Sequence, residues 1–184
     1  MGDPSVGKTS IIKTFMEGKA QHTAIRTPMV SDFCKIIEVM VDEKKYRVKL
    51  NIWDAAGDGD VHNLAHLFVR DVQVGILCYG INSQKSFSSL DTWLSHLNES
   101  NENFSLLLVG NKSDLNEQRS VPTNYGHRKR QEIGEKCVMF KETSAFNDVE
   151  SIMSLFDEIG KAIVPIVLGS KSKQHDPRRG SRQL

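Results

Sequence analysis

Cysteine is scarce in this sequence of 184 residues, and the few cysteines form no pattern. Cys34, Cys78 and Cys137 are odd in number and far apart, which excludes a disulfide framework and a cysteine-based metal site. Each of them falls in a strand-like apolar run. We therefore expect three reduced cysteines in the hydrophobic core.

Long apolar runs and an excess of one charge are lacking as well. No stretch approaches the roughly 18 apolar residues that a helix needs to cross a bilayer, and the N-terminus does not have the pattern of a secretion signal. This favours a cytoplasmic protein. The formal net charge is +1, from 24 basic and 23 acidic residues, so no overall field favours nucleic acid as a partner.

What is present fits one domain followed by a polar tail. Hydrophobic residues make up 39% of the chain, enough to fill one core, and we place the domain at 1–166 and a flexible basic tail at 167–184. A membrane could be contacted only through this tail or through a partner, and a solvated charge run is the simpler interpretation. No cysteine follows Cys137, so a C-terminal lipid anchor cannot be inferred from the sequence. The basic residues of the tail are Lys171, Lys173, Arg178, Arg179 and Arg182.

A glycine-rich segment at 2–9 matches the phosphate-binding pattern G-x-x-x-x-G-K-[ST] at each fixed position. Its glycines let the backbone come close enough for successive N–H groups to face phosphates. Lys8 would reach the β- and γ-phosphates, and Thr9 would offer its hydroxyl to Mg²⁺. The predicted phosphate-binding residues are Gly2, Asp3, Pro4, Ser5, Val6, Gly7, Lys8, Thr9 and Ser10.

The segments on the two sides of this loop differ. Residues 10–17 predict a helix that stops at Gly18, so the phosphates would meet a helix N-terminus. A phosphate-binding loop needs a hydrophobic strand in front of it, and here only Met1 precedes the loop. We therefore expect the first strand of the sheet to be missing and the domain to be truncated at its N-terminus.

Polar motifs follow three other predicted strands. Asp54 and Gly57 come after the strand at 46–53, where Asp54 would act on Mg²⁺ and the Gly57 N–H would meet a γ-phosphate. Asn111, Lys112 and Asp114 follow an apolar run that ends at Gly110. Since the Asp114 carboxylate can accept two N–H donors from guanine, which adenine lacks, this motif selects guanine. After the strand at 137–141 come Ser144 and Ala145, and the Ala145 amide could meet the guanine O6.

The order of elements predicts an α/β fold. Strands at about 34–41 and 46–53 form a hairpin around residues 42–45, and further strands are expected near 73–79, 104–110 and 137–141. Helices near 84–98 and 124–136 separate these strands, and a last helix runs from 148 to 163, with Pro165 ending it. Such alternation implies a mostly parallel sheet with helices on both faces.

In this order the motifs resemble those of the Ras superfamily of small GTP-binding proteins, from Gly2 to about Val164, and most of all the Rab branch. The resemblance implies the P-loop NTPase fold of a small GTPase G domain, binding of GTP or GDP with Mg²⁺, GTP hydrolysis, and a switch in vesicle trafficking or signalling. It implies effectors, exchange factors and activating proteins as partners, bound through loops near Thr27 and Asp58. An aromatic surface of Phe33, Trp53 and Phe68 would take part, and the protein would be a monomer in the cytoplasm or peripheral on endomembranes.

Two departures from the family pattern concern catalysis. The switch threonine is best matched by Thr27, with Thr23 as the alternative, but Pro28 follows Thr27 and restricts it to extended conformations. Asp58 stands where the family has a glutamine that orients water, and a carboxylate cannot donate a hydrogen bond to a γ-phosphate oxygen. We expect slow hydrolysis, with Lys8, Thr27, Gly57 and Asp58 as the catalytic set and Thr9, Thr27 and Asp54 as the metal site.

Two other functions stay open at this point. A nucleotide-binding interaction module that barely hydrolyses GTP is favoured by Asp58 and Pro28. A P-loop kinase or ATPase is weaker, because it gives no role to Asn111, Lys112 and Asp114.

Overall fold

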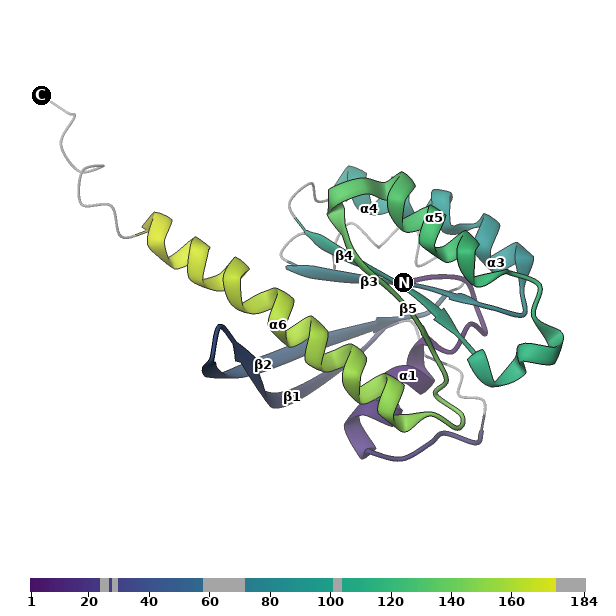
Figure 1. The fold of residues 1–184 in the computed structure, drawn as a ribbon, viewed down its shortest axis with the longest axis horizontal. Coiled ribbons are helices and arrows are strands. Elements are labelled where there is room, and N and C mark those ends of the chain that lie inside the picture. Colours follow the sequence, from purple (N-terminus) through teal and green to yellow (C-terminus); the bar gives the residue numbers. More distant parts are fainter. Residues whose placement is uncertain (24–26, 28–29, 58–71, 101–103, 175–184) are drawn as a thin grey trace, which may run out of the picture.

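The computed structural model describes residues 1–23, 27, 30–57, 72–100 and 104–174. Helices and strands alternate along the second half of the chain, after an N-terminal helix and a hairpin (Figure 1). The elements are α1 (Lys8–Glu17), β1 (Val30–Val41), β2 (Lys44–Ala55), β3 (Val74–Gly80), α3 (Gln84–Ser88), α4 (Leu90–Ser100), β4 (Ser105–Asn111), η1 (Ser113–Gln118), α5 (Thr123–Ile133), η2 (Gly134–Lys136), β5 (Cys137–Thr143) and α6 (Val149–Gln174).

Strands β3, β4 and β5 form a parallel sheet that is covered on both faces. Alternate residues of β4 point to opposite sides: Leu107 and Val109 pack with α1 and α6, whereas Leu106 and Leu108 pack with α4 and α5. Figure 1 shows α3, α4 and α5 on one side of the strands and α1 and α6 on the other. The predicted α/β fold with a parallel sheet and helices on both faces is confirmed.

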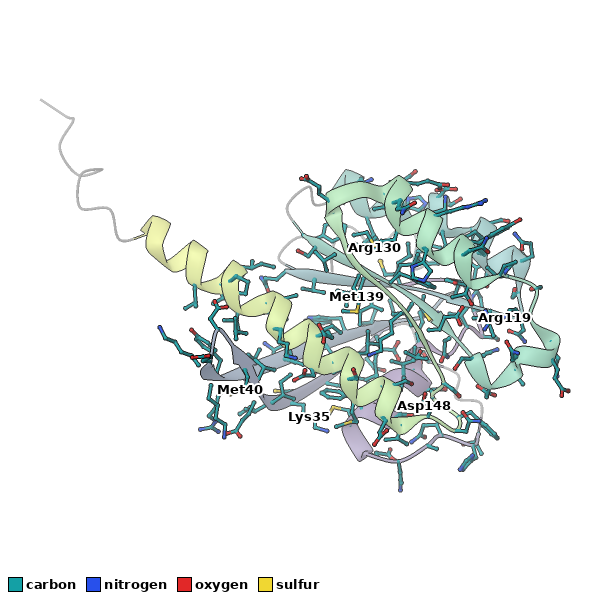
Figure 2. All side chains as sticks on the ribbon, in the orientation of Figure 1. Lys35, Met40, Arg119, Arg130, Met139 and Asp148 are labelled. Carbon is teal, nitrogen blue, oxygen red and sulfur yellow. The ribbon has the colours of Figure 1, made fainter. Side chains whose placement is uncertain are left out.

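The predicted hairpin is present and its strands are longer than expected. In β1 and β2, Val30 lies opposite Ala55 and Val41 lies opposite Lys44. The turn contains only Asp42 and Glu43, both with positive φ of 48° and 61°, which fits the turn type whose twist matches paired strands. The hairpin buries one face only, so alternate residues such as Met40 are exposed (Figure 2). Cys34 falls on the exposed face, so the prediction that all three cysteines are buried is wrong at this position.

Strands β2 and β3 are not paired, and among the described residues no strand lies between them. A cavity of about 480 Å³ separates them, lined by both strands and by α1 and α6. Met1 lies at one end of this gap, where its amino group donates to the Ile76 carbonyl and its carbonyl accepts from the Cys78 N–H at 2.8 Å. This is the bonding pattern of one residue in a parallel ladder, opposite Leu77. The sheet is thus divided where a first strand was expected to be missing.

Three helix predictions need correction. Helix α1 begins at Lys8 rather than at residue 10, and the helix expected at 84–98 is broken at Ser89 into α3 and α4. Pro165 does not end α6, which continues to Gln174, so the boundary predicted between 166 and 167 falls inside a helix.

The continuation of α6 has a packing reason. Val164 is buried in the core next to Pro165, and Val167 and Leu168 line the cavity beside β2, so apolar contacts hold the helix on both sides of the proline. Among the described residues, no helix combines the length and the apolar character that a bilayer span requires.

Candidate functional site

A pocket of about 710 Å³ opens at the carboxyl ends of the parallel strands. The loop before α1 forms one end of it, and the segments after β4 and β5 form the other. Parallel α/β sheets hold ligands at this edge, because the loops after the strands converge there. The predicted site residues that line it are Pro4, Ser5, Gly7, Lys8, Thr9, Ser10, Thr27, Gly57, Asn111, Lys112, Asp114 and Ala145.

The loop before α1 is wound tightly around Lys8. The Lys8 Nζ donates to the carbonyls of Gly2 and Asp3, each at 2.9 Å, so the ammonium lies inside the ring of the loop. Gly7 has a φ of 94°, and a Cβ there would lie 2.2 Å from the side-chain nitrogen of Asn111, so glycine is required. α1 begins directly after Gly7, and the first N–H groups of a helix point away from its own carbonyls and favour an anion.

Not every residue of this loop faces the pocket. The Asp3 carboxylate accepts from the Trp93 indole N–H at 2.8 Å and so anchors the loop to α4. Val6 is buried in the core with α1. Gly2 packs against the backbone of Cys78. Of the predicted phosphate-binding residues, these three support the loop and do not line the pocket.

Three oxygen-bearing side chains meet beside Lys8. The Thr9 hydroxyl donates to Asp54 Oδ2 at 2.7 Å, the Thr27 hydroxyl lies 3.4 Å from the same oxygen, and the two hydroxyls contact each other. Asp54 is only 2% exposed, and its Oδ1 is buried without a hydrogen-bond partner. Such an oxygen is costly unless a cation or a water satisfies it. This donor set fits Mg²⁺, which prefers hard oxygen ligands.

Thr23 and Gly57, two other site residues predicted near this cluster, are not part of it. Thr23 is exposed and lines the pocket, and within the described part of the chain no hydrogen bond joins it to Thr9, Thr27 or Asp54. Gly57 packs on the phosphate loop, where an added Cβ would lie 2.4 Å from the Pro4 nitrogen. The loop after β2 can therefore approach the phosphate loop only because residue 57 is glycine. Asp58 and Pro28 lie outside the described residues.

Asn111 joins the two ends of the pocket. Its buried side-chain amide donates to the Val6 carbonyl at 2.8 Å, and its Oδ1 accepts from the Thr143 hydroxyl and the Ala145 N–H, each at 3.3 Å. The phosphate loop, the end of β4 and the segment after β5 are thereby fixed to one side chain.

Asp114 lies at the far end of the pocket, where its Oδ1 accepts a hydrogen bond of 2.5 Å from Ser144. Lys112, with a φ of 68°, turns the chain so that it and Asp114 both line the pocket. Ser144 is buried behind Asp114. Because Ser144 binds Oδ1, the Asp114 Oδ2 can accept hydrogen bonds from donors of a ligand.

The comparisons with known proteins agree with this arrangement. A sequence model of the Ras family matches residues 1–165. The chain is 31% identical to the Ras-related protein RabQ of Dictyostelium discoideum over 167 residues, 90% of this chain and 78% of that protein. It is 35% identical to the Ras-related protein Rab-44 of Mus musculus over 159 residues, 84% of this chain but only 16% of that protein. The chain belongs to the Ras family. Within it, the chain is a Rab-like small GTPase, and the resemblance seen in the motifs is confirmed.

Two of the three residues of the aromatic surface expected for a Rab-like chain lie on opposite faces of the hairpin. Phe33 lies opposite Ile52 and packs against the core, whereas Trp53 lies opposite Asp32 and is 54% exposed. Neighbouring residues of a paired strand point to opposite faces, so the hairpin register separates Phe33 from Trp53. Phe68 lies outside the described residues.

The pocket of this Ras-family chain also has a wall that the sequence did not indicate. Gln21, His22, Leu115 and Phe146 line it together with the predicted residues. Leu115 and Phe146 directly follow Asp114 and Ala145, so their position next to the motifs was an available signal. His22 and Gln21 lie in a segment without a pattern, and only the folded chain brings them to the pocket.

Proposed function

We propose that this chain is a guanine-nucleotide switch that binds GTP or GDP with Mg²⁺. The observation that carries the proposal is the convergence on one pocket of a phosphate loop, the Asp114 carboxylate, and the Thr9 and Thr27 hydroxyls. Both hydroxyls contact the buried carboxylate of Asp54 behind them. A P-loop kinase or ATPase is not favoured, because the Asp114 carboxylate accepts donors that adenine does not present.

The two ends of the pocket have different tasks. Lys8 and the N–H groups at the start of α1 bind the β- and γ-phosphates, and Thr9, Thr27 and Asp54 hold the cation. Mg²⁺, when bound there, neutralises phosphate charge. At the other end, Asp114 accepts from the guanine N1 and 2-amino groups, Lys112 covers the ring with its stem, and the Ala145 amide meets O6.

The switch follows from the residues that sense the γ-phosphate. Thr27 contacts Thr9 in the first turn of α1, and Gly57 packs against Pro4 of the phosphate loop. In the GTP state the loops near Thr27 and Gly57 are held against the γ-phosphate, and hydrolysis releases them. Partners that distinguish the two states read the loops near Thr27 and Asp58.

Proteins of this family interact with effectors, exchange factors and activating proteins, and we propose the same classes of partner for this chain. We place its work in vesicle trafficking or signalling, as a monomer in the cytoplasm or peripheral on endomembranes. Contact with a membrane would come through the tail or through a partner. The relatives named above are Ras-related Rab proteins, which supports this assignment.

Binding is tested by competition against fluorescent GDP, with GTP, GDP and ATP as competitors, in Mg²⁺ and after its chelation. GTP and GDP should compete, ATP should not, and chelation should weaken binding. Equal competition by ATP would contradict the guanine assignment.

Asp58 supports a second candidate, a binding module with little hydrolysis. The carboxylate repels phosphate charge and cannot donate to a γ-phosphate oxygen, so orienting water is left to other groups. Asp58→Gln should raise the rate of phosphate release in a single turnover, by about 10-fold or more. If the unmodified chain released phosphate as fast as Asp58→Gln, Asp58 would not be what slows catalysis. If neither protein released phosphate, the binding module would be favoured.

A further inference from the structure

Two rings meet edge to face at the end of the pocket where Asp114 lies. His22, from the segment after α1, and Phe146, from the segment after β5, lie with ring centroids 4.9 Å apart and planes at 87°. Both line the pocket that holds Asp114 and Lys112. Phe146 is 49% exposed, unusual for a large apolar side chain at the mouth of a polar pocket.

The backbone holds these rings in a fixed relation to Asp114. The Ser144 hydroxyl that donates to Asp114 also accepts from the N–H groups of Phe146 and Asn147, each at 3.2 Å. The Gln21 N–H donates to the Ala145 carbonyl at 2.9 Å, which ties the segment of His22 to that of Phe146. The Thr14 hydroxyl donates to the same carbonyl at 3.1 Å. The carboxylate and the ring pair are therefore parts of one hydrogen-bonded unit.

We infer that Phe146 and His22 form an aromatic wall against which the purine ring of the bound nucleotide packs. Phe146 supplies the contact surface, and His22 positions the Phe146 ring through the edge contact. This inference rests on the proposed nucleotide binding and adds two residues that the motifs do not contain. A purine placed there would cover the exposed ring, and stacking of bases on aromatic side chains is favourable whatever the base.

The test compares a ligand with a base to a ligand without one. Calorimetry measures the affinities of Mg-GDP and of Mg-pyrophosphate for the full chain and for Phe146→Ala. We expect GDP to bind about 5- to 150-fold more weakly to the variant, the range that loss of one stacked aromatic produces. Pyrophosphate, which has no base, should bind both proteins equally.

Further variants separate the wall from a structural role. Phe146→Tyr keeps a ring and should retain GDP affinity within about 3-fold. His22→Ala should weaken GDP binding less than Phe146→Ala does, and the double variant should bind GDP about as weakly as Phe146→Ala alone. Tyr125→Ala, which removes an exposed ring from α5, is the matched control and should change neither affinity.

The outcomes are distinct. Unchanged GDP binding by Phe146→Ala would overturn the aromatic wall and leave the proposed function standing. An equal loss of GDP and pyrophosphate would also overturn it, since the ring would then support the fold of the loop. If the unmodified chain bound pyrophosphate but not GDP, the guanine assignment and the wall would fail together.

Discussion

At the scale of single residues, Asp114 is the side chain on which the choice of base depends. Asp114→Asn replaces one acceptor oxygen by a donor, which would face a guanine donor in the pocket. We expect GDP and GTP to bind about 3 kcal/mol more weakly, roughly 150-fold, and the xanthine nucleotide to gain. The Ser144 hydroxyl can still donate to the amide oxygen, so the fold should persist.

Competition with GDP, the xanthine diphosphate and ADP measures this change of preference. Glu117→Gln, an exposed acidic residue of the same short helix, is the matched control and should leave all three affinities unchanged. If Asp114→Asn bound GDP as well as the unmodified chain does, the carboxylate would not read the base.

The amino group of Met1 is a second residue with a measurable consequence. Burial lowers the pKa of this group from its usual value near 8 to about 6, and the charge of Lys8 acts in the same direction. The unfolded chain binds the proton more strongly between these values, so folding becomes more favourable as the pH rises from 6 to 8. A pKa lowered from 8 to about 6 changes the free energy of unfolding by about 2.7 kcal/mol over the whole titration, of which about 1.9 kcal/mol falls between pH 6 and 8.

Urea unfolding at pH 6, 7 and 8 measures this gain for the chain that begins at Met1. Acetylation of the amino group removes the titration and should remove the part of the pH dependence that it causes. Identical pH profiles for the free and the acetylated chain would contradict the burial of the amine.

At the scale of elements, α6 passes a proline without ending. Pro165 has no N–H to donate to the carbonyl four residues earlier, and its ring crowds that turn. Pro165→Ala restores the bond, and we expect the chain to be more stable by about 1–2 kcal/mol, after allowance for the freer unfolded chain. Chemical unfolding followed by circular dichroism measures the change. Met153→Ala, exposed on the same helix, should shift stability by less than about 0.5 kcal/mol. A loss of stability in Pro165→Ala would show that the proline suits its turn.

The elements also show what the sequence could and could not predict. The fold class and the order of the elements along the chain were predictable because alternating apolar runs and fixed motif spacings are local properties of the chain. The faces of Phe33 and Cys34 were not, since they depend on the pairing register of β1 with β2. The length of α6 was missed because its apolar contacts with the core outweigh a local breaker. Nor could spacing predict that His22 meets Phe146, which are far apart in the chain.

At the scale of the whole molecule, the gap between β2 and β3 divides the sheet. Peptide groups of even-numbered residues in β3 face this gap, as the bonds of Ile76 and Cys78 to Met1 show. The Ile76 N–H lies there, whereas the Leu77 N–H faces β4. We expect the Ile76 amide to exchange its hydrogen at least about 10²-fold faster than the Leu77 amide. We also expect the free energy of unfolding of the domain to lie near or below about 5 kcal/mol, the lower end of the usual range.

Hydrogen exchange followed by nuclear magnetic resonance measures both quantities. Saturating Mg-GDP should raise the free energy of unfolding by linkage, about 4 kcal/mol at a thousand times its dissociation constant. The exchange of the Ile76 amide should slow by much less, because this amide exchanges at the gap without global unfolding. Equal protection of Ile76 and Leu77 in the free chain would indicate that the gap is closed in solution.

The buried side chain of Asn111 couples the phosphate side of the nucleotide site to its base side. One amide holds the carbonyl of Val6 on the phosphate side and the hydroxyl of Thr143 and amide of Ala145 on the base side. A ligand fragment that immobilises either side immobilises the shared amide, so the second fragment meets a site already ordered. A nucleoside and a separate pyrophosphate should therefore bind this chain with positive cooperativity, each raising the affinity of the other by the same factor.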